Sequence, residues 1–133
     1  MKKILFIALL AISFVSVAED NKFSADYDKC MNKAGPAGDF SGMVSCMQNE
    51  FNTQDIALNK AYKSAISRLN KEMSGNLQEA QREWIKYRDA NFKLLESKSN
   101  YVSDVIVVLE ANEWLLNLTA SRTKEIDSLS SAK

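Results

Sequence analysis

Carboxylates are the side chains in this sequence whose number and spacing come nearest to a catalytic arrangement. A pair of carboxyl groups can hydrolyse a glycoside, with one acting as acid and the other as base or nucleophile. Glu50 and Asp55 form one candidate pair, and Glu79 and Glu83, four residues apart, form another. However, 17 acidic residues on amphipathic helices produce such pairs by chance. We therefore interpret these carboxylates as parts of solvated helix faces.

Other catalytic chemistries lack the residues they need. The sequence contains no histidine, the usual base of a serine or cysteine triad. Its four glycines form neither a phosphate-binding nor a dinucleotide-binding pattern. No basic patch points to nucleic acid as a partner. We therefore predict a protein that is not an enzyme and that holds no metal and no cofactor.

The two cysteines, Cys30 and Cys46, could pair with each other, act as reactive thiols or bind a metal. Two thiols in a sequence without histidine make a poor zinc site. In an exported protein, two cysteines most simply form a disulfide. For a loop of about 15 residues, the chain-entropy description of a disulfide gives ~3 kcal/mol of stabilisation. We favour the structural disulfide.

Residues 1–18 have the three-part layout of a secretory signal peptide. Lys2 and Lys3 precede an apolar run over residues 4–15, and small residues lead up to Ala18. The apolar run is too short for a membrane span, which needs about 20 residues. Cleavage after Ala18 would remove two lysines from a chain with 17 basic and 17 acidic residues, leaving it slightly acidic. We expect a periplasmic or secreted protein with no membrane span after cleavage.

The rest of the chain should be entirely helical, since apolar residues recur at three- and four-residue steps and no strand pattern has a partner. The expected helices cover about residues 24–34, 39–73, 77–97 and 101–129. Three long antiparallel helices joined by short turns form a bundle, to which the disulfide staples the short first helix. This predicts an all-α single domain over residues 19–129, followed by a frayed tail at 130–133.

Local signals set the expected helix ends. Ser24 is a suitable N-cap for the first helix, and Gly35-Pro36 should stop it. The second helix is long enough that a kink near Asn52-Thr53 is possible. Ser74-Gly75-Asn76 should end it, and Ser97 to Asn100 should separate the third helix from the fourth.

Residues that recur at three- and four-residue steps on each long helix define the expected core face, and most of them are apolar. They are Val44, Met47, Phe51, Leu58, Ala61, Ala65 and Leu69 on the second helix, Leu77, Ala80, Trp84, Tyr87, Asn91 and Leu94 on the third, and Val105, Val108, Leu115, Thr119, Arg122, Ile126 and Leu129 on the fourth.

A set of polar side chains lies on or beside this core face. Arg88 and Arg122 need a carboxylate and further hydrogen bonds if they are buried there, and Asp55 and Glu50 are the available partners. We favour an internal network that fixes the register of the helices over a polar binding groove. The candidate members of the network are Glu50, Asp55, Asn59, Tyr62, Gln81, Trp84, Arg88, Thr119 and Arg122.

The same residues carry a resemblance to a known family. Cys30 and Cys46 are followed by Asp55-x-x-Leu58-Asn59-x-x-Tyr62, by Gln81-x-x-Trp84-Ile85-x-x-Arg88-Asp89-Ala90 and by Thr119-x-x-Arg122. Over about residues 27–126 this pattern resembles the family of the lysozyme inhibitor LprI. The resemblance implies a helical, disulfide-stapled exported domain that binds and inhibits lysozyme-type muramidases without catalysis.

The sequence also departs from that family. Members usually carry a second pair of cysteines where this chain has Phe92 and, in the last helix, a position near Trp114. Both are absent together, which suggests that large apolar side chains fill the space. The lipid-attachment cysteine of the lipoprotein LprI is absent as well.

Two exposed segments are candidates for binding a partner. The first is the loop Gly35-Pro36-Ala37-Gly38-Asp39, because a disulfide would preorganise it and Asp39 could address a cationic cleft. The second is the turn from Ser97 to Asn100. The leading hypothesis is an inhibitor of lysozyme-type muramidases. The alternative is a non-catalytic structural or stress protein that binds another envelope component. The oligomeric state is open.

Overall fold

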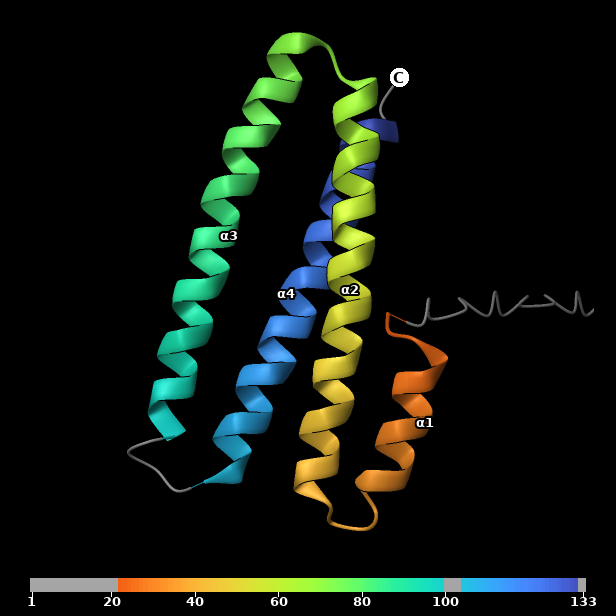
Figure 1. Cartoon of the computed structure of the whole chain (residues 1–133), viewed down its shortest axis with the longest axis vertical. Helices are drawn as coiled ribbons and strands as arrows, with labels where there is room; N and C mark the ends of the chain where they lie inside the picture. The colour runs from red at the N-terminus through yellow and green to blue at the C-terminus, as the bar shows by residue number, and fades with distance from the viewer. Residues whose placement is uncertain (1–21, 100–103, 132–133) are drawn as a thin grey trace, which may run out of the picture.

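The computed structural model describes residues 22–99 and 104–131, which form the helices shown in Figure 1. They are α1 (Ala25–Ala34), α2 (Phe40–Arg68), α3 (Lys71–Ser99) and α4 (Val105–Ser131). Within these ranges there is no strand. The prediction of an all-α bundle is therefore confirmed. The signal peptide expected at residues 1–18 lies outside the described residues.

Successive helices run antiparallel, as Figure 1 shows. α4 is the central helix, because it packs extensively along α2 and also packs against α3. By contrast, α2 and α3 contact each other little beyond the turn that joins them. α1 packs on the first half of α2. The three long helices thus form the predicted bundle, with α3 leaning away from α2 toward its own C-terminal end.

α1 begins and ends where its local sequence predicts. The Ser24 hydroxyl accepts a hydrogen bond from the Tyr27 N–H at 3.1 Å, which makes Ser24 the N-cap. The helix ends at Ala34, and the chain turns through Gly38, whose positive φ of 65° favours glycine. Asp39 then caps α2, because its Oδ1 accepts from the Gly42 N–H at 2.8 Å.

The boundary between the second and third helices was predicted wrongly. α2 ends at Arg68, and α3 runs from Lys71 straight through Gly75. The turn forms at Leu69, which is extended, and at Asn70, whose Oδ1 accepts from the Met73 N–H at 2.9 Å. Gly75 is tolerated inside α3 because this part of the helix is exposed.

The other helix ends differ by a few residues from the prediction. α2 is uninterrupted at Asn52-Thr53, so the kink considered there is absent. α3 continues to Ser99, so three of the four residues expected to form the turn from Ser97 to Asn100 belong to the helix, and Asn100 lies outside the described residues. α4 begins at Val105 and continues to Ser131. Just before its first residue, Asp104 Oδ1 accepts a hydrogen bond from the Ile106 N–H.

The core lies between α2 and α4, with α3 closing one side. Most expected apolar positions of α2 are buried or half-buried. Five expected core positions are exposed instead: Ala80, Tyr87, Leu94, Val105 and Leu129. For the three on α3, the reason is that this helix contacts mainly one neighbour, so part of its apolar face stays uncovered. The tightest cluster comprises Leu58, Ala61, Ala65, Leu77 and Ile126.

Candidate functional site

Glu50 fastens the start of α1 to the middle of α2. Its carboxylate, only 2% exposed, accepts from the Ser24 N–H at 3.0 Å and from the Ser24 hydroxyl at 2.5 Å. A third donor, Gln54 Nε2, lies 2.6 Å away. The Ser24 hydroxyl therefore donates to α2 while it caps α1. Glu50 thus has hydrogen-bonding partners that compensate for its burial.

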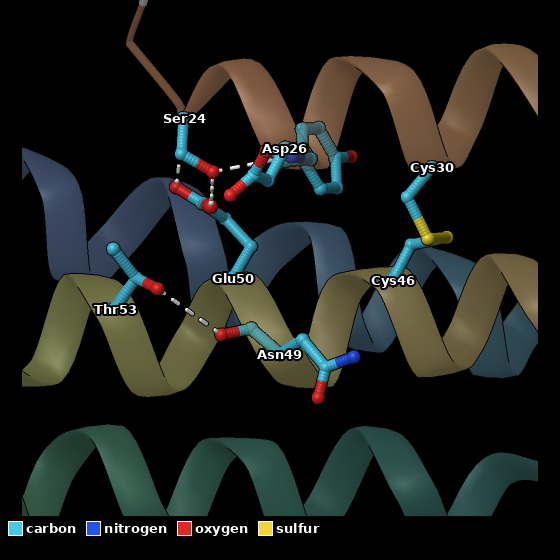
Figure 2. A pocket seen from close by; sticks show the side chains of 8 residues that line it. Ser24, Asp26, Cys30, Cys46, Asn49, Glu50 and Thr53 are labelled. Carbon is cyan, nitrogen blue, oxygen red and sulfur yellow. Dashed lines mark hydrogen bonds between the residues drawn. A yellow bond between two sulfur atoms is a disulfide. The ribbon is translucent and has the colours of Figure 1, made fainter.

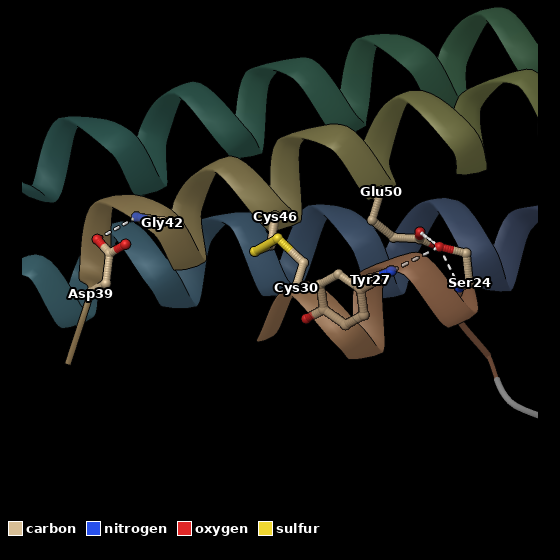
Figure 3. Close-up of a disulfide and its surroundings, with 7 residues drawn as sticks. All are labelled: Ser24, Tyr27, Cys30, Asp39, Gly42, Cys46 and Glu50. Carbon is tan, nitrogen blue, oxygen red and sulfur yellow. Dashed lines mark hydrogen bonds between the residues drawn. A yellow bond between two sulfur atoms is a disulfide. The ribbon is translucent and has the colours of Figure 1, made fainter. Parts of the chain in front are cut away.

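The disulfide is the second attachment of α1. Cys30 and Cys46 are bonded, with their Cα atoms 5.7 Å apart, as predicted from the sequence (Figure 3). A helix of ten residues is too short to be stable alone, since isolated helices need roughly 12–15 residues. The sulfur bridge and the Glu50 hydrogen bonds therefore hold α1 at two separate points on α2.

A hollow of about 310 Å³ lies between these two attachments (Figure 2). Its lining residues are Ser24, Asp26, Tyr27, Cys30, Cys46, Asn49, Glu50 and Thr53. Burial, followed by the charges of Glu113, Glu50 and Asp28, raises the pKa of the Tyr27 phenol above its usual 10.0. Three donors engage the Glu50 carboxylate, two at Oε1 and one at Oε2, so this buried group is committed to holding α1 on α2.

The loop between α1 and α2 is exposed throughout residues 35–39. The disulfide joins the two helices that flank this loop, and the Asp39 side chain caps the start of α2. A second hollow of about 310 Å³ opens beside the loop, lined by Lys33, Asp39 and the cysteines among others. The predicted binding loop Gly35, Pro36, Gly38 and Asp39 is thus accessible and anchored at both ends.

The polar residues form a cluster at the junction of α2, α3 and α4, centred on Trp84. The guanidinium of Arg88 lies 5.3 Å from the Trp84 ring centroid, and that of Arg122 lies 5.9 Å from it. Arg88 Nη1 also lies 3.3 Å from Asp55 Oδ1. Arg122 Nε donates to the buried Gln81 Oε1 at 3.0 Å. Two cations therefore contact one indole, and each also reaches a polar partner.

Further contacts complete the surroundings of Arg88. Its Nε donates to Asp89 at 2.8 Å, and its guanidinium lies 5.6 Å from the Phe51 ring centroid. Asn59 Nδ2 donates to Asp55 Oδ2 at 3.1 Å, which helps to orient that carboxylate. The Arg88 side chain is only 13% exposed. Its charge is therefore matched by two carboxylates and two aromatic faces.

Three expected members of the network lie elsewhere. Glu50 binds Ser24 and Gln54, as described above, and does not pair with an arginine. The buried Thr119 hydroxyl donates to the Leu115 carbonyl of its own helix at 2.8 Å. Tyr62 packs against the apolar cluster. Sequence reasoning missed the role of Glu50 because the position of α1 on α2 was needed to reveal it.

Two kinds of feature are absent from the described part of the chain. No group of three or more His, Cys, Asp or Glu side chains there could hold a metal ion. Among the same residues, no helix combines the length and the apolarity needed to cross a membrane.

Comparison with known proteins decides the family. The sequence model of the lysozyme inhibitor LprI family matches residues 30–126, which is most of the chain. The chain belongs to the LprI family. This LprI domain spans the sequence from the disulfide to the buried Ile126 of α4, so it contains both the anchored loop and the Trp84 cluster.

The chain is also similar to a protein of Escherichia coli K12 named "Uncharacterized protein YecT". The two are 28% identical over 146 residues, and the match covers 95% of this chain and 90% of that protein. No solved structure matches the chain.

Proposed function

We propose that this LprI-family chain is an exported binding protein that inhibits a lysozyme-type muramidase. The supporting observation is the family match over residues 30–126, together with the anchored, exposed loop at residues 35–39. In this proposal the first 18 residues direct export and are removed, and the mature chain acts without catalysis in the periplasm or outside the cell.

The loop is the part of the chain that would enter the cleft of the muramidase. Its flanks are fixed by the disulfide and by the Asp39 cap, so little conformational entropy would be lost on binding. Oδ1 of Asp39 caps α2, and the exposed carboxylate keeps Oδ2 available for a cationic partner. Charge complementarity would then speed association and make it sensitive to salt.

The experiment is a cell-wall lysis assay with several lysozyme-type muramidases, with and without the purified, disulfide-bonded chain. Saturable loss of lysis with at least one enzyme supports the proposal. Full lysis by every enzyme at a large excess of chain contradicts it. If the chain instead binds a different envelope component and leaves lysis unchanged, the alternative of a structural or stress protein replaces it.

A charge-only variant tests the placement of the loop. Asn is as good an N-cap as Asp, so Asp39→Asn keeps α2 capped while it removes the negative charge. We expect it to weaken inhibition about tenfold or more, as for loss of an interfacial charge pair. Asp127→Asn is the matched control, since it removes an exposed carboxylate near the end of α4, away from the loop (Figure 1). Equal inhibition by both variants would contradict the placement.

A further inference from the structure

An uncovered row of side chains runs along α3 at a strict spacing of seven residues. Met73, Ala80, Tyr87 and Leu94 are all exposed, and the three large ones are 46%, 52% and 65% accessible. A seven-residue spacing keeps side chains on nearly the same edge of a helix, with a drift of only ~20° per repeat. We call these four residues the α3 row. A seam between helices carries apolar residues at two positions of each heptad, and the α3 row supplies one of them.

α4 extends this surface at two places. The exposed Leu129 lines, with Met73 and Ala80, a mostly apolar hollow of about 320 Å³. Further along, the Trp114 ring centroid lies 6.3 Å from that of Tyr87. Of nine large apolar side chains that are exposed in the described ranges, four belong to this surface. Apolar side chains that gather in this way along one side of a bundle are typical of an interaction site.

The charges beside the α3 row indicate which partner fits it. Each residue of the row is preceded by an exposed charged residue, in the order Glu72, Glu79, Lys86 and Lys93. The first half of this edge is therefore acidic and the second half basic. If two copies of α3 lie antiparallel, Glu72 faces Lys93 of the other copy and Glu79 faces Lys86. A parallel pair would set like charges opposite each other.

We propose that the α3 row is a self-association surface, on which a second copy of this chain packs its own α3 in antiparallel orientation. A two-fold axis brings the same patch of both copies together, which requires a self-complementary surface. The acidic-then-basic order meets that requirement, and it favours a second copy over an unrelated partner.

One intrahelical ion pair lies within this edge. Lys86 Nζ is 2.7 Å from Glu83 Oε1, and both side chains are more than half exposed. Such exposed pairs contribute little, so Lys86 can also face Glu79 of the other copy. Glu83 lies close to the expected two-fold axis, where Lys86 of its own helix balances its charge.

Sedimentation equilibrium of the full secreted chain over a range of concentrations and salt tests the proposal. The unaltered chain should show a monomer–dimer equilibrium that weakens with added salt. Leu94→Glu should raise the dimer dissociation constant about tenfold or more, because it buries a charge in the seam. Ile56→Glu is the matched control, since Ile56 is 71% exposed on α2 and should leave the equilibrium unchanged.

Charge reversal tests the orientation. The double variant Lys86→Glu, Lys93→Glu makes the whole edge acidic and should give monomers. Adding Glu72→Lys and Glu79→Lys restores two opposite halves and should restore the dimer. A chain that is monomeric at near-millimolar concentration overturns the proposal, as does a dimer that Leu94→Glu leaves intact. Failure of the fourfold variant to dimerise while it remains folded also overturns it. Vesicle binding by a chain that stays monomeric would assign the row to a membrane surface instead.

Discussion

Replacing Arg88 with alanine is expected to destabilise the bundle, because its guanidinium connects α3 to α2 at the Trp84 cluster. The change removes the ion pair with Asp55 and the stacking of the cation on Phe51 and Trp84. It also removes the hydrocarbon stem of a side chain that is only 13% exposed. Asp55 loses a cationic partner at the same time.

The size of the effect follows from these contacts. Each cation–π contact contributes roughly 0.5–1 kcal/mol at sites of this kind. The ion pair with Asp55, whose side chain is 38% exposed, adds roughly 0.5–1 kcal/mol. With the lost packing of the stem, the total decrease in the free energy of unfolding is about 2–3 kcal/mol. For a domain of this size that lowers Tm by roughly 10 °C.

Thermal and urea unfolding followed by circular dichroism measure the effect. Arg88→Met keeps most of the stem and should recover part of the loss, and Arg88→Lys keeps the charge but not the planar stacking. Arg82→Ala is the matched control, because it removes an exposed cation from the same helix, outside both the Trp84 cluster and the charged edge of the α3 row. If Arg88→Ala unfolds within about 1 °C of the unaltered chain, the cluster does not stabilise the bundle.

Three further predictions concern α1. Glu50→Gln should lower the free energy of unfolding by about 1–2 kcal/mol, since the single amide oxygen cannot accept from all three donors. Urea denaturation measures this, and an unchanged free energy of unfolding would show that the Glu50 carboxylate is dispensable. The double variant Cys30→Ser, Cys46→Ser should lower the free energy of unfolding by ~3 kcal/mol and should inhibit the muramidase less well. Equal stability of the oxidised and reduced forms of the unaltered chain would contradict this prediction. Folding raises the pKa of the Tyr27 phenol. The protonated phenol therefore contributes to the free energy of unfolding below pH 10.0, and this contribution is lost as the pH rises through the pKa of the folded state. Tyr27→Phe should therefore flatten the fall of stability above pH 10.0, and an unaltered alkaline profile would exclude this role.

The features that could be predicted from the sequence are those with strong local signals. α1 was placed correctly because Ser24 is a good cap and Gly35-Pro36 a strong stop. The disulfide followed from the presence of two cysteines in an expected secreted chain. The α2–α3 turn was misplaced because Ser74-Gly75-Asn76 looked like a stronger break than Asn70, whose cap depends on the geometry of the turn.

Features that depend on packing between helices could not be predicted. Asp55 and Glu50 were both expected as partners for the two arginines, and of these two carboxylates only Asp55 pairs with one of them, Arg88. Glu50 was assigned to the same network, although the docking of α1 directs it to Ser24. Tyr87 and Leu94 have the spacing of core residues but are exposed, because periodicity does not reveal how much of a face a neighbour covers.

Amide hydrogen exchange of the chain, alone and with saturating muramidase, tests most directly whether the anchored loop is the binding surface. The proposal predicts that exchange slows at the amides of residues 35 and 37–42, around the loop and the Asp39 cap, and stays unchanged in the second half of α3. Unchanged exchange at the loop in the presence of the enzyme would contradict it.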